Sequence, residues 1–123
     1  MLKMPERAKQ VGKLSQRVIE VLGLTLSEGR SILLGESNIA HRHPEDYALY
    51  GEYLPLILSM PDYVALNTKD ESIEYVKEVQ MDDVYVKVAV RVSARGQLFA
   101  RSVYRLNTNR AKNFIEKGTL KKY

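Results

Sequence analysis

The sequence predicts a single α+β domain in which N-terminal helices pack on a four-stranded antiparallel β-sheet meander, followed by a C-terminal helix. Apolar residues recur at helical spacing in the first half of the chain and alternate in the second half, where only short loops separate the alternating segments. At 123 residues the chain can bury one core without disulfides or a structural metal. Its 45% hydrophobic and 28% charged residues are typical of a folded globular protein.

The first helix is expected from Pro5 to Leu22, because proline is tolerated in a first helical turn and Gly23 can end the helix. Its apolar face would consist of Val11, Leu14, Val18 and Leu22. The segment from residue 24 to 35 ends in a short apolar run, which fits either a strand or a buried turn.

A second helix is expected from Pro44 to Ser59, with Pro61 marking its end. Its inward stripe would consist of Tyr47, Tyr50 or Gly51, Leu54 and Leu58. Ahead of this helix, Ser37 is a plausible cap for a short helical turn over residues 38–43.

The second half of the chain is expected to form four strands, over residues 63–66, 72–79, 84–93 and 97–106. Short loops between them indicate an antiparallel meander. A last helix should begin at a cap on Asn107 or Thr108, extend to Lys117 and close at Gly118. Within one domain, we expect an N-terminal helical extension (1–31), a core (32–117) and a basic tail (118–123).

Valine occupies every even position of the third strand from Val84 to Val92, so we expect that face of the strand to be buried. A two-residue hairpin turn at Arg95 and Gly96 would set Val92 opposite Phe99. The same register pairs Val88 with Val103, Lys87 with Tyr104, Ala89 with Ser102 and Arg91 with Ala100. Lys87, Arg91, Ser102 and Tyr104 then share the exposed face. Cations and hydroxyls so placed suit phosphate recognition, although an ordinary solvent-facing sheet carries the same residue types.

Basic residues are concentrated at the two ends of the chain, whereas the middle is acidic. If both ends fold onto one side, they form a surface that can neutralise phosphates, although solvated helix faces have the same composition. The residues expected to contact RNA are Lys87, Arg101, Arg105, Arg110 and Lys112.

The chain contains no cysteine, which excludes disulfides, cysteine-based zinc sites and thiol nucleophiles. No apolar stretch is long enough to span a bilayer, and the first ten residues lack the apolar core of a signal peptide. We therefore expect a protein of the cytoplasm, bacterial or of a phage-infected host, that binds no membrane.

Both histidines lie in one short segment, as His41 and His43, directly before Pro44. Because histidine exchanges protons near neutral pH, the pair is a candidate for general acid and base catalysis. Two alternatives remain open: a metal site completed by Glu45 or Asp46, for which no further ligand motif is recognisable, and a structural capping role.

The chain resembles the phage nucleases of the barnase, EndoU, colicin and RelE superfamily from about Ile32 to the C-terminus. The resemblance rests on the order and spacing of six short strings, at residues 36–41, 43–44, 61–64, 72–77, 86–91 and 101–104. It implies helices packed on a four-stranded antiparallel sheet whose surface carries the active site.

The resemblance also implies metal-independent cleavage of RNA, with no cofactor. A base would activate the 2′-hydroxyl, cations would stabilise the phosphorane, and an acid would protonate the departing 5′-oxygen. By similarity, His41 or His43 would transfer protons, Lys77 and Arg91 would stabilise charge, and Ser102 with Tyr104 would bind the phosphate or base. The expected partners are single-stranded or loop RNA and an inhibitor or antitoxin protein.

Two functions fit this sequence. The first is a metal-independent endoribonuclease of phage or prophage origin. The second is a non-catalytic RNA-binding or phage-assembly protein that retains the nuclease fold, because a fold alone does not guarantee an activity.

Overall fold

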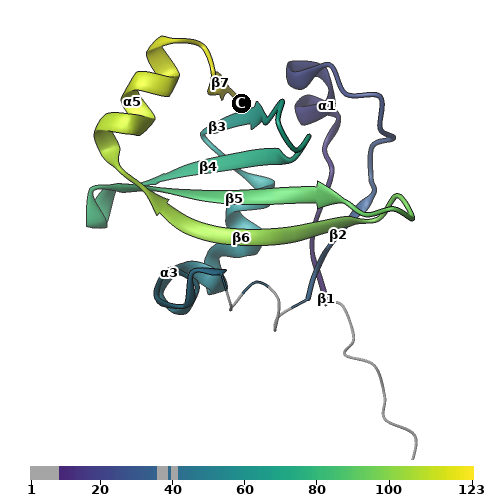
Figure 1. The fold of residues 1–123 in the computed structure, drawn as a ribbon, viewed down its shortest axis with the longest axis horizontal. Coiled ribbons are helices and arrows are strands. Elements are labelled where there is room, and N and C mark those ends of the chain that lie inside the picture. The colour runs from purple at the N-terminus through teal and green to yellow at the C-terminus, as the bar shows by residue number, and fades with distance from the viewer. Residues whose placement is uncertain (1–8, 36–38, 40–41) are drawn as a thin grey trace, which may run out of the picture.

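The computed structural model describes residues 9–35, 39 and 42–123, and within them seven strands form one mixed sheet (Figure 1). The strand order is β1-β2-β6-β5-β4-β3-β7. In chain order the elements are β1 (Lys9–Lys13), α1 (Gln16–Leu22), β2 (Ser31–Leu34), α3 (Pro44–Tyr50), the 3-10 turn η1 (Gly51–Tyr53), α4 (Leu54–Ser59), β3 (Tyr63–Leu66), β4 (Ile73–Val79), the 3-10 turn η2 (Gln80–Asp82), β5 (Val84–Val92), β6 (Leu98–Leu106), α5 (Thr108–Glu116) and β7 (Lys121–Lys122).

The predicted α+β class is confirmed, but the predicted four-stranded sheet is too small. Strands β3, β4, β5 and β6 are consecutive antiparallel neighbours, as expected of a meander. At one edge β7 pairs with β3, and at the other β2 runs parallel to β6 and carries β1. These additional strands are short, or they pair with strands that are distant in the sequence. The periodicity of apolar residues within a segment cannot predict which distant strand it pairs with.

The first helix is shorter than predicted, and the prediction was wrong over Lys9–Lys13, which form β1. The helix begins only after Ser15, whose side chain accepts a hydrogen bond from the backbone N–H of Val18. A Cβ at Gly12 would lie 3.1 Å from Cβ of Leu58, so glycine lets β1 approach α4 closely. The predicted stop at Gly23 is confirmed, with φ of 66°.

The second helix occupies the predicted range but is divided into α3 and α4 by the turn η1. Proline has no N–H, so Pro55 cannot complete the helical bond to the carbonyl of Gly51. That carbonyl instead accepts a bond from the N–H of Leu54. Tyr50, Leu54 and Leu58 are buried, as the predicted stripe requires.

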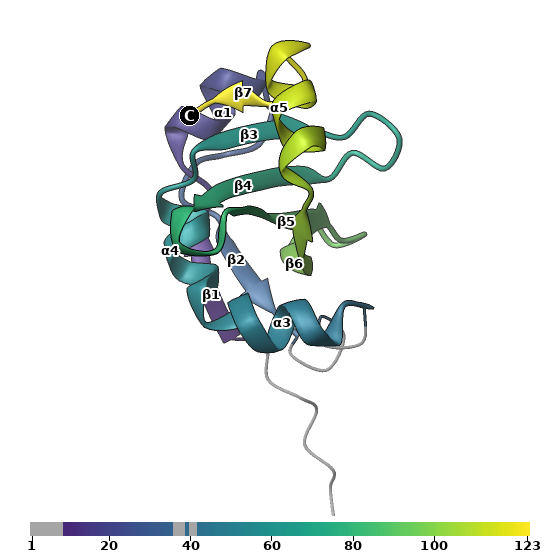
Figure 2. The same cartoon turned by 90° about the vertical axis from the view of Figure 1, so that its left-hand side faces the viewer.

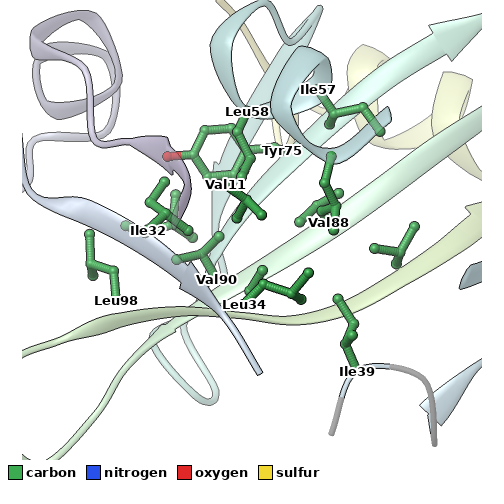
Figure 3. Packing of buried hydrophobic residues seen from close by; sticks show 14 of the residues in the cluster. Val11, Ile32, Leu34, Ile39, Ile57, Leu58, Tyr75, Val88, Val90 and Leu98 are labelled. Carbon is green, nitrogen blue, oxygen red and sulfur yellow. The ribbon is translucent and has the colours of Figure 1, made fainter. Parts of the chain in front are cut away.

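The main core lies between the valine face of the sheet and the helices α1 and α4, and the edge strand β1 adds Val11 to it (Figure 2). Val86, Val88 and Val90 are fully buried, and Figure 3 shows Val88 and Val90 beside side chains of α4 and β2. Val92 is 41% exposed at the strand end, so the predicted burial holds for the middle of β5 and not for its end.

The hairpin between β5 and β6 differs from the predicted register in two ways that compensate. The N–H of Ser93 bonds to the carbonyl of Gln97, so the turn has one residue more than predicted, with Gly96 at φ of 79°. Near the turn, Val92 therefore faces Leu98 and Arg91 faces Phe99, and both predicted pairs were wrong.

A β-bulge between Ala89 and Val90 then shifts the register back. Beyond it, the predicted partners of Lys87, Val88 and Ala89 are confirmed: Tyr104, Val103 and Ser102. Arg101 is the extra residue of the bulge, because Val90 pairs with Ala100 and Ala89 pairs with Ser102.

The sheet face opposite the valines, called the open face below, is divided between an apolar end and a polar end. At the apolar end, α5 packs through Ala111 on Val76, Tyr85 and Leu106. Asn107, one of the two predicted caps, caps α5, and its side chain accepts bonds from the N–H groups of Asn109 and Arg110. The helix stops short of the remaining open face, and Figure 2 shows it on the side of the sheet away from α1 and α4.

Candidate functional site

The polar end of the open face contains a cavity of about 430 Å³, called the candidate cavity. It lies over β4, β5 and β6 and is bordered by the loop between β3 and β4 and by the residues that precede α3. Its described lining consists of Arg42, His43, Asn67, Asp70, Ser72, Glu74, Lys87, Ala89, Arg91, Arg101, Ser102 and Tyr104.

An ion pair between Lys87 and Glu74 forms the floor of the candidate cavity. The Lys87 ammonium lies 2.7 Å from Oε2 of Glu74, and the two side chains are only 13% and 10% exposed. Burial alone would lower the pKa of Lys87, but the hydrogen bond and charge of Glu74, aided by Tyr104, outweigh it and raise that pKa. The pair therefore places a fixed cation and an acceptor carboxylate side by side within reach of a ligand.

His43 lies over Tyr104 at the rim of the cavity, with ring centroids 4.7 Å apart. Tyr104 also lies close to the ion pair, because the Lys87 ammonium is 5.6 Å from the centroid of the Tyr104 ring. Although His43 stands at the N-cap of α3, its side chain makes no capping hydrogen bond. A capping role therefore does not explain His43, whose side chain is exposed to solvent.

The position of His43 depends on how α3 attaches to β6. Asp46, in the first turn of α3, accepts a bond of 2.7 Å from Nε of Arg105 and another of 3.1 Å from its backbone N–H. These bonds join the start of α3 to β6 one residue beyond Tyr104. They use Nε of Arg105 alone among its guanidinium nitrogens, and the Arg105 side chain remains 45% exposed. The RNA contact expected of Arg105 therefore stays a prediction.

The loop between β3 and β4 borders the cavity with two polar side chains. Asp70 accepts bonds of 2.7 and 3.0 Å from the hydroxyl and N–H of Ser72. These bonds, with the positive charge of Arg91, hold the pKa of Asp70 below its ordinary value against the opposing effect of desolvation. Asn67 donates a bond of 3.4 Å to Glu74 and so helps to orient that carboxylate.

The bulge at Arg101 turns two consecutive residues of β6 toward the cavity. Alternation alone would direct Arg101 and Ser102 to opposite faces, yet both line the candidate cavity. Ser102 is 7% exposed beside Ala89, and Arg101 joins Arg91 and Arg42 at the outer rim.

Some of the predicted site residues lie together in the candidate cavity, and others lie elsewhere in the structure. His43, Lys87, Arg91, Arg101, Ser102 and Tyr104 line the candidate cavity, whereas Lys77 does not. The Lys77 ammonium bonds to the carbonyl of Met60 at 2.8 Å and lies 3.6 Å from Asp62, on the core side of the sheet. Arg110 and Lys112 are on α5, outside the cavity, and the guanidinium of Arg110 lies over Phe114. His41 lies outside the described residues.

Glu74, Asp70 and Arg42 are the charged members of the cavity that the sequence did not predict, and Asn67, Ser72 and Ala89 also line it. Glu74 alternates with the core residues Ile73 and Tyr75, and its pairing with Ala89 places it beside Lys87. The available signal was a carboxylate between the apolar residues Ile73 and Tyr75, in the predicted strand that precedes the one with Lys87. Arg42 stands between the two histidines, and Asp70 lies in the loop between the first two predicted strands, where acidic residues are common.

Among the described residues, no group of three or more histidine, aspartate or glutamate side chains is arranged to hold a metal ion. In the same part of the chain, no helix has the length and apolar character needed to cross a bilayer.

The sequence profile of one family matches residues 9–113, from β1 into α5. The family is described as phage-Barnase-EndoU-ColicinE5/D-RelE like nuclease 3, and the matched range contains every described residue of the candidate cavity. Neither a curated protein nor a solved structure matches the chain. The candidate cavity offers cations, hydroxyls and proton-exchanging groups in one place, as hydrolysis of a phosphodiester requires. The chain therefore belongs to the phage-Barnase-EndoU-ColicinE5/D-RelE like nuclease 3 family.

Proposed function

We propose that this protein is a metal-independent endoribonuclease that cleaves RNA in the candidate cavity by attack of a 2′-hydroxyl on the adjacent phosphate. The observation that carries the proposal is the continuous contact from His43 through Tyr104 to Lys87 and Glu74. It combines two side chains able to exchange protons with a fixed cation between them, in a nuclease of this family.

In this reaction a carboxylate and a histidine divide the proton transfers. Glu74 accepts the proton of the 2′-hydroxyl as the 2′-oxygen bonds to phosphorus. His43, in its protonated form, donates a proton to the 5′-oxygen as the bond between phosphorus and that oxygen breaks. The products are a 2′,3′-cyclic phosphate and a free 5′-hydroxyl, so that the numbers of atoms and protons balance.

The remaining side chains of the cavity stabilise the negative charge that develops on phosphorus. Lys87, held charged by Glu74, also lies 5.6 Å from the centroid of the Tyr104 ring that His43 contacts. Tyr104 and Ser102 can donate hydrogen bonds to the phosphate oxygens, and Arg91 and Arg101 supply further charge at the rim. A preorganised donor of this kind contributes roughly 100-fold to 1,000-fold in rate.

Analysis of the cleavage products tests the proposed chemistry. A labelled single-stranded RNA incubated with the protein and excess EDTA should yield 2′,3′-cyclic phosphate and 5′-hydroxyl ends. The matched substrate, with 2′-deoxy sugars throughout, should remain intact because it lacks the nucleophile. Cleavage of the deoxy substrate, or complete loss of cleavage in EDTA, would exclude this mechanism. Binding of RNA with no cleavage would favour the non-catalytic RNA-binding protein instead.

A further inference from the structure

A second and larger hollow adjoins the candidate cavity at the end of the sheet near the hairpin turn. Its volume is about 620 Å³, within the range of about 300–1,000 Å³ common for small-molecule sites. It is called the arginine hollow here, and its described lining consists of Gly35, Arg42, Arg91, Val92, Ser93, Phe99, Ala100 and Arg101.

The two cavities are joined by shared residues. Arg42, Arg91 and Arg101 line both of them, so a ligand that occupies one cavity can extend into the other past the same three guanidinium groups. This continuity depends on the bulge, which brings Arg101 to the open face, and on the longer hairpin turn, which sets Arg91 opposite Phe99.

The guanidinium groups of these arginines have no bonded partner among the described residues. None of the three forms a side-chain hydrogen bond or an ion pair there, although the charge of Arg91 acts on Asp70 across the candidate cavity. By contrast, Lys87 is paired with Glu74 and Arg105 with Asp46. No described residue of the arginine hollow is acidic, in contrast to the candidate cavity with Asp70 and Glu74. Three unpaired guanidinium groups around one hollow favour an anion, and phosphate suits their planar, bidentate geometry.

Phe99 gives the hollow a second recognition element. It is the one aromatic side chain in the described lining, and it remains partly exposed although its neighbours Leu98 and Ala100 are buried. Every nucleobase can stack on an aromatic face, whatever its sequence, provided that the base is not already stacked in a duplex.

We propose that the arginine hollow is a subsite that binds the nucleotide next to the scissile phosphate, with its base on Phe99 and its phosphate among Arg42, Arg91 and Arg101. The inference rests on the proposed ribonuclease function and extends it to the substrate class: an unpaired RNA segment that continues beyond the cleaved bond. Duplex RNA is excluded because its bases cannot separate to reach Phe99.

A comparison of short and extended substrates tests the subsite. The wild-type protein should cleave a dinucleoside monophosphate with lower kcat/KM than the same unit extended by one nucleotide on the side that occupies the hollow. Stacking on an aromatic residue is typically worth a factor of about 10 or more, so the ratio of the two kcat/KM values should be of that order. In Phe99→Leu the ratio should fall to about 1–2, and Phe99→Tyr should restore it. The matched control is Tyr53→Leu, which removes another exposed aromatic ring outside both cavities and should preserve the ratio.

A binding measurement separates failure of the subsite from failure of the proposed function. A 2′-O-methyl oligonucleotide with 2-aminopurine beside the central phosphate cannot be cleaved by 2′-hydroxyl attack, and its fluorescence should change on binding to the wild type but not to Phe99→Leu. If no RNA is cleaved but this difference persists, the function is wrong and the subsite stands. If RNA is cleaved and Phe99→Leu matches the wild type in both measurements, the subsite is overturned and the function stands.

Discussion

Lys87 illustrates how the surroundings of one residue change its expected role. The sequence places it on a solvent-facing strand surface, where trimming a lysine has little effect on stability. In the structure its side chain is only 13% exposed and paired with Glu74, so its removal leaves a buried carboxylate without a partner. The residue that binds phosphate in the proposed reaction is therefore also part of the fold.

We expect Lys87→Met to lower the free energy of unfolding by about 2–4 kcal/mol, because the Glu74 carboxylate loses its cation in a poorly solvated site. The double variant Lys87→Met with Glu74→Gln should recover part of this loss, since no unpaired charge then remains. Urea denaturation measures both, with Lys112→Met on the exposed surface of α5 as the control. Equal stabilities of Lys87→Met and Lys112→Met would contradict the buried ion pair.

The same pair predicts a pH dependence of stability. Glu74 raises the pKa of Lys87 above its ordinary value of 10.5, so the folded state retains this proton more strongly than the unfolded chain. The contribution of the pair is therefore complete below about pH 10 and is lost as the pH rises through the higher folded-state pKa. We expect the stability difference between the wild type and Lys87→Met to be constant from about pH 7 to pH 10 and to narrow above it. If the stability difference between the wild type and Lys87→Met instead narrows from neutral pH to pH 6, a group other than Lys87 causes the pH dependence.

At the residue scale, strand alternation predicted the polar residues of β5 and β6 that line the cavity, except Arg101, which the bulge turns toward it. It could not predict Glu74, because a carboxylate in a strand is usually exposed and only the pairing of β4 with β5 brings it beside Lys87. Lys77 was expected in the active site only from the resemblance to the nuclease superfamily. Alternation along β4 directs its side chain to the face opposite Glu74.

At the scale of elements, β5 separates the core from the site. Val88→Asp should unfold the domain, because an unpaired carboxylate in the core costs several kcal/mol. Val92→Asp is the matched control, because Val92 also occupies an even position of β5 but is 41% exposed. This substitution should lower the free energy of unfolding by about 1 kcal/mol or less. Thermal melts of the two variants decide the matter, and similar melting temperatures would mean that the buried face of β5 is wrongly assigned.

The hairpin shows why elements are easier to predict than their pairing. The ranges of β5 and β6 were predicted to within one residue at each end, whereas the turn length and the bulge were not. No sequence signal distinguishes a bulge at Arg101 from regular pairing. The interior pairs were nevertheless correct because the longer turn and the bulge shift the register by one residue each in opposite directions.

At the scale of the whole molecule, the sequence predicted the class and the family but not the full sheet. Both edges depend on contacts between distant segments: β1 and β2 attach to β6, and β7 attaches to β3. The C-terminal segment is held by this pairing and by Leu120, which is only 4% exposed. Ser15 and Arg17 both contact Tyr123, so the start of α1 and the C-terminal residue meet beside the β3–β7 edge of the sheet.

The central claim is that the candidate cavity on the open face is the active site, and single-turnover cleavage of RNA in EDTA tests it most directly. His43→Ala should lower the rate by about 100-fold or more while its melting temperature stays close to that of the wild type. Lys77→Ala, which sequence similarity would place in the active site, should retain a rate within a few-fold of the wild type, because its ammonium lies on the core side at Met60. Full activity in His43→Ala, or an equally large loss in a folded Lys77→Ala, would contradict the assignment of the cavity.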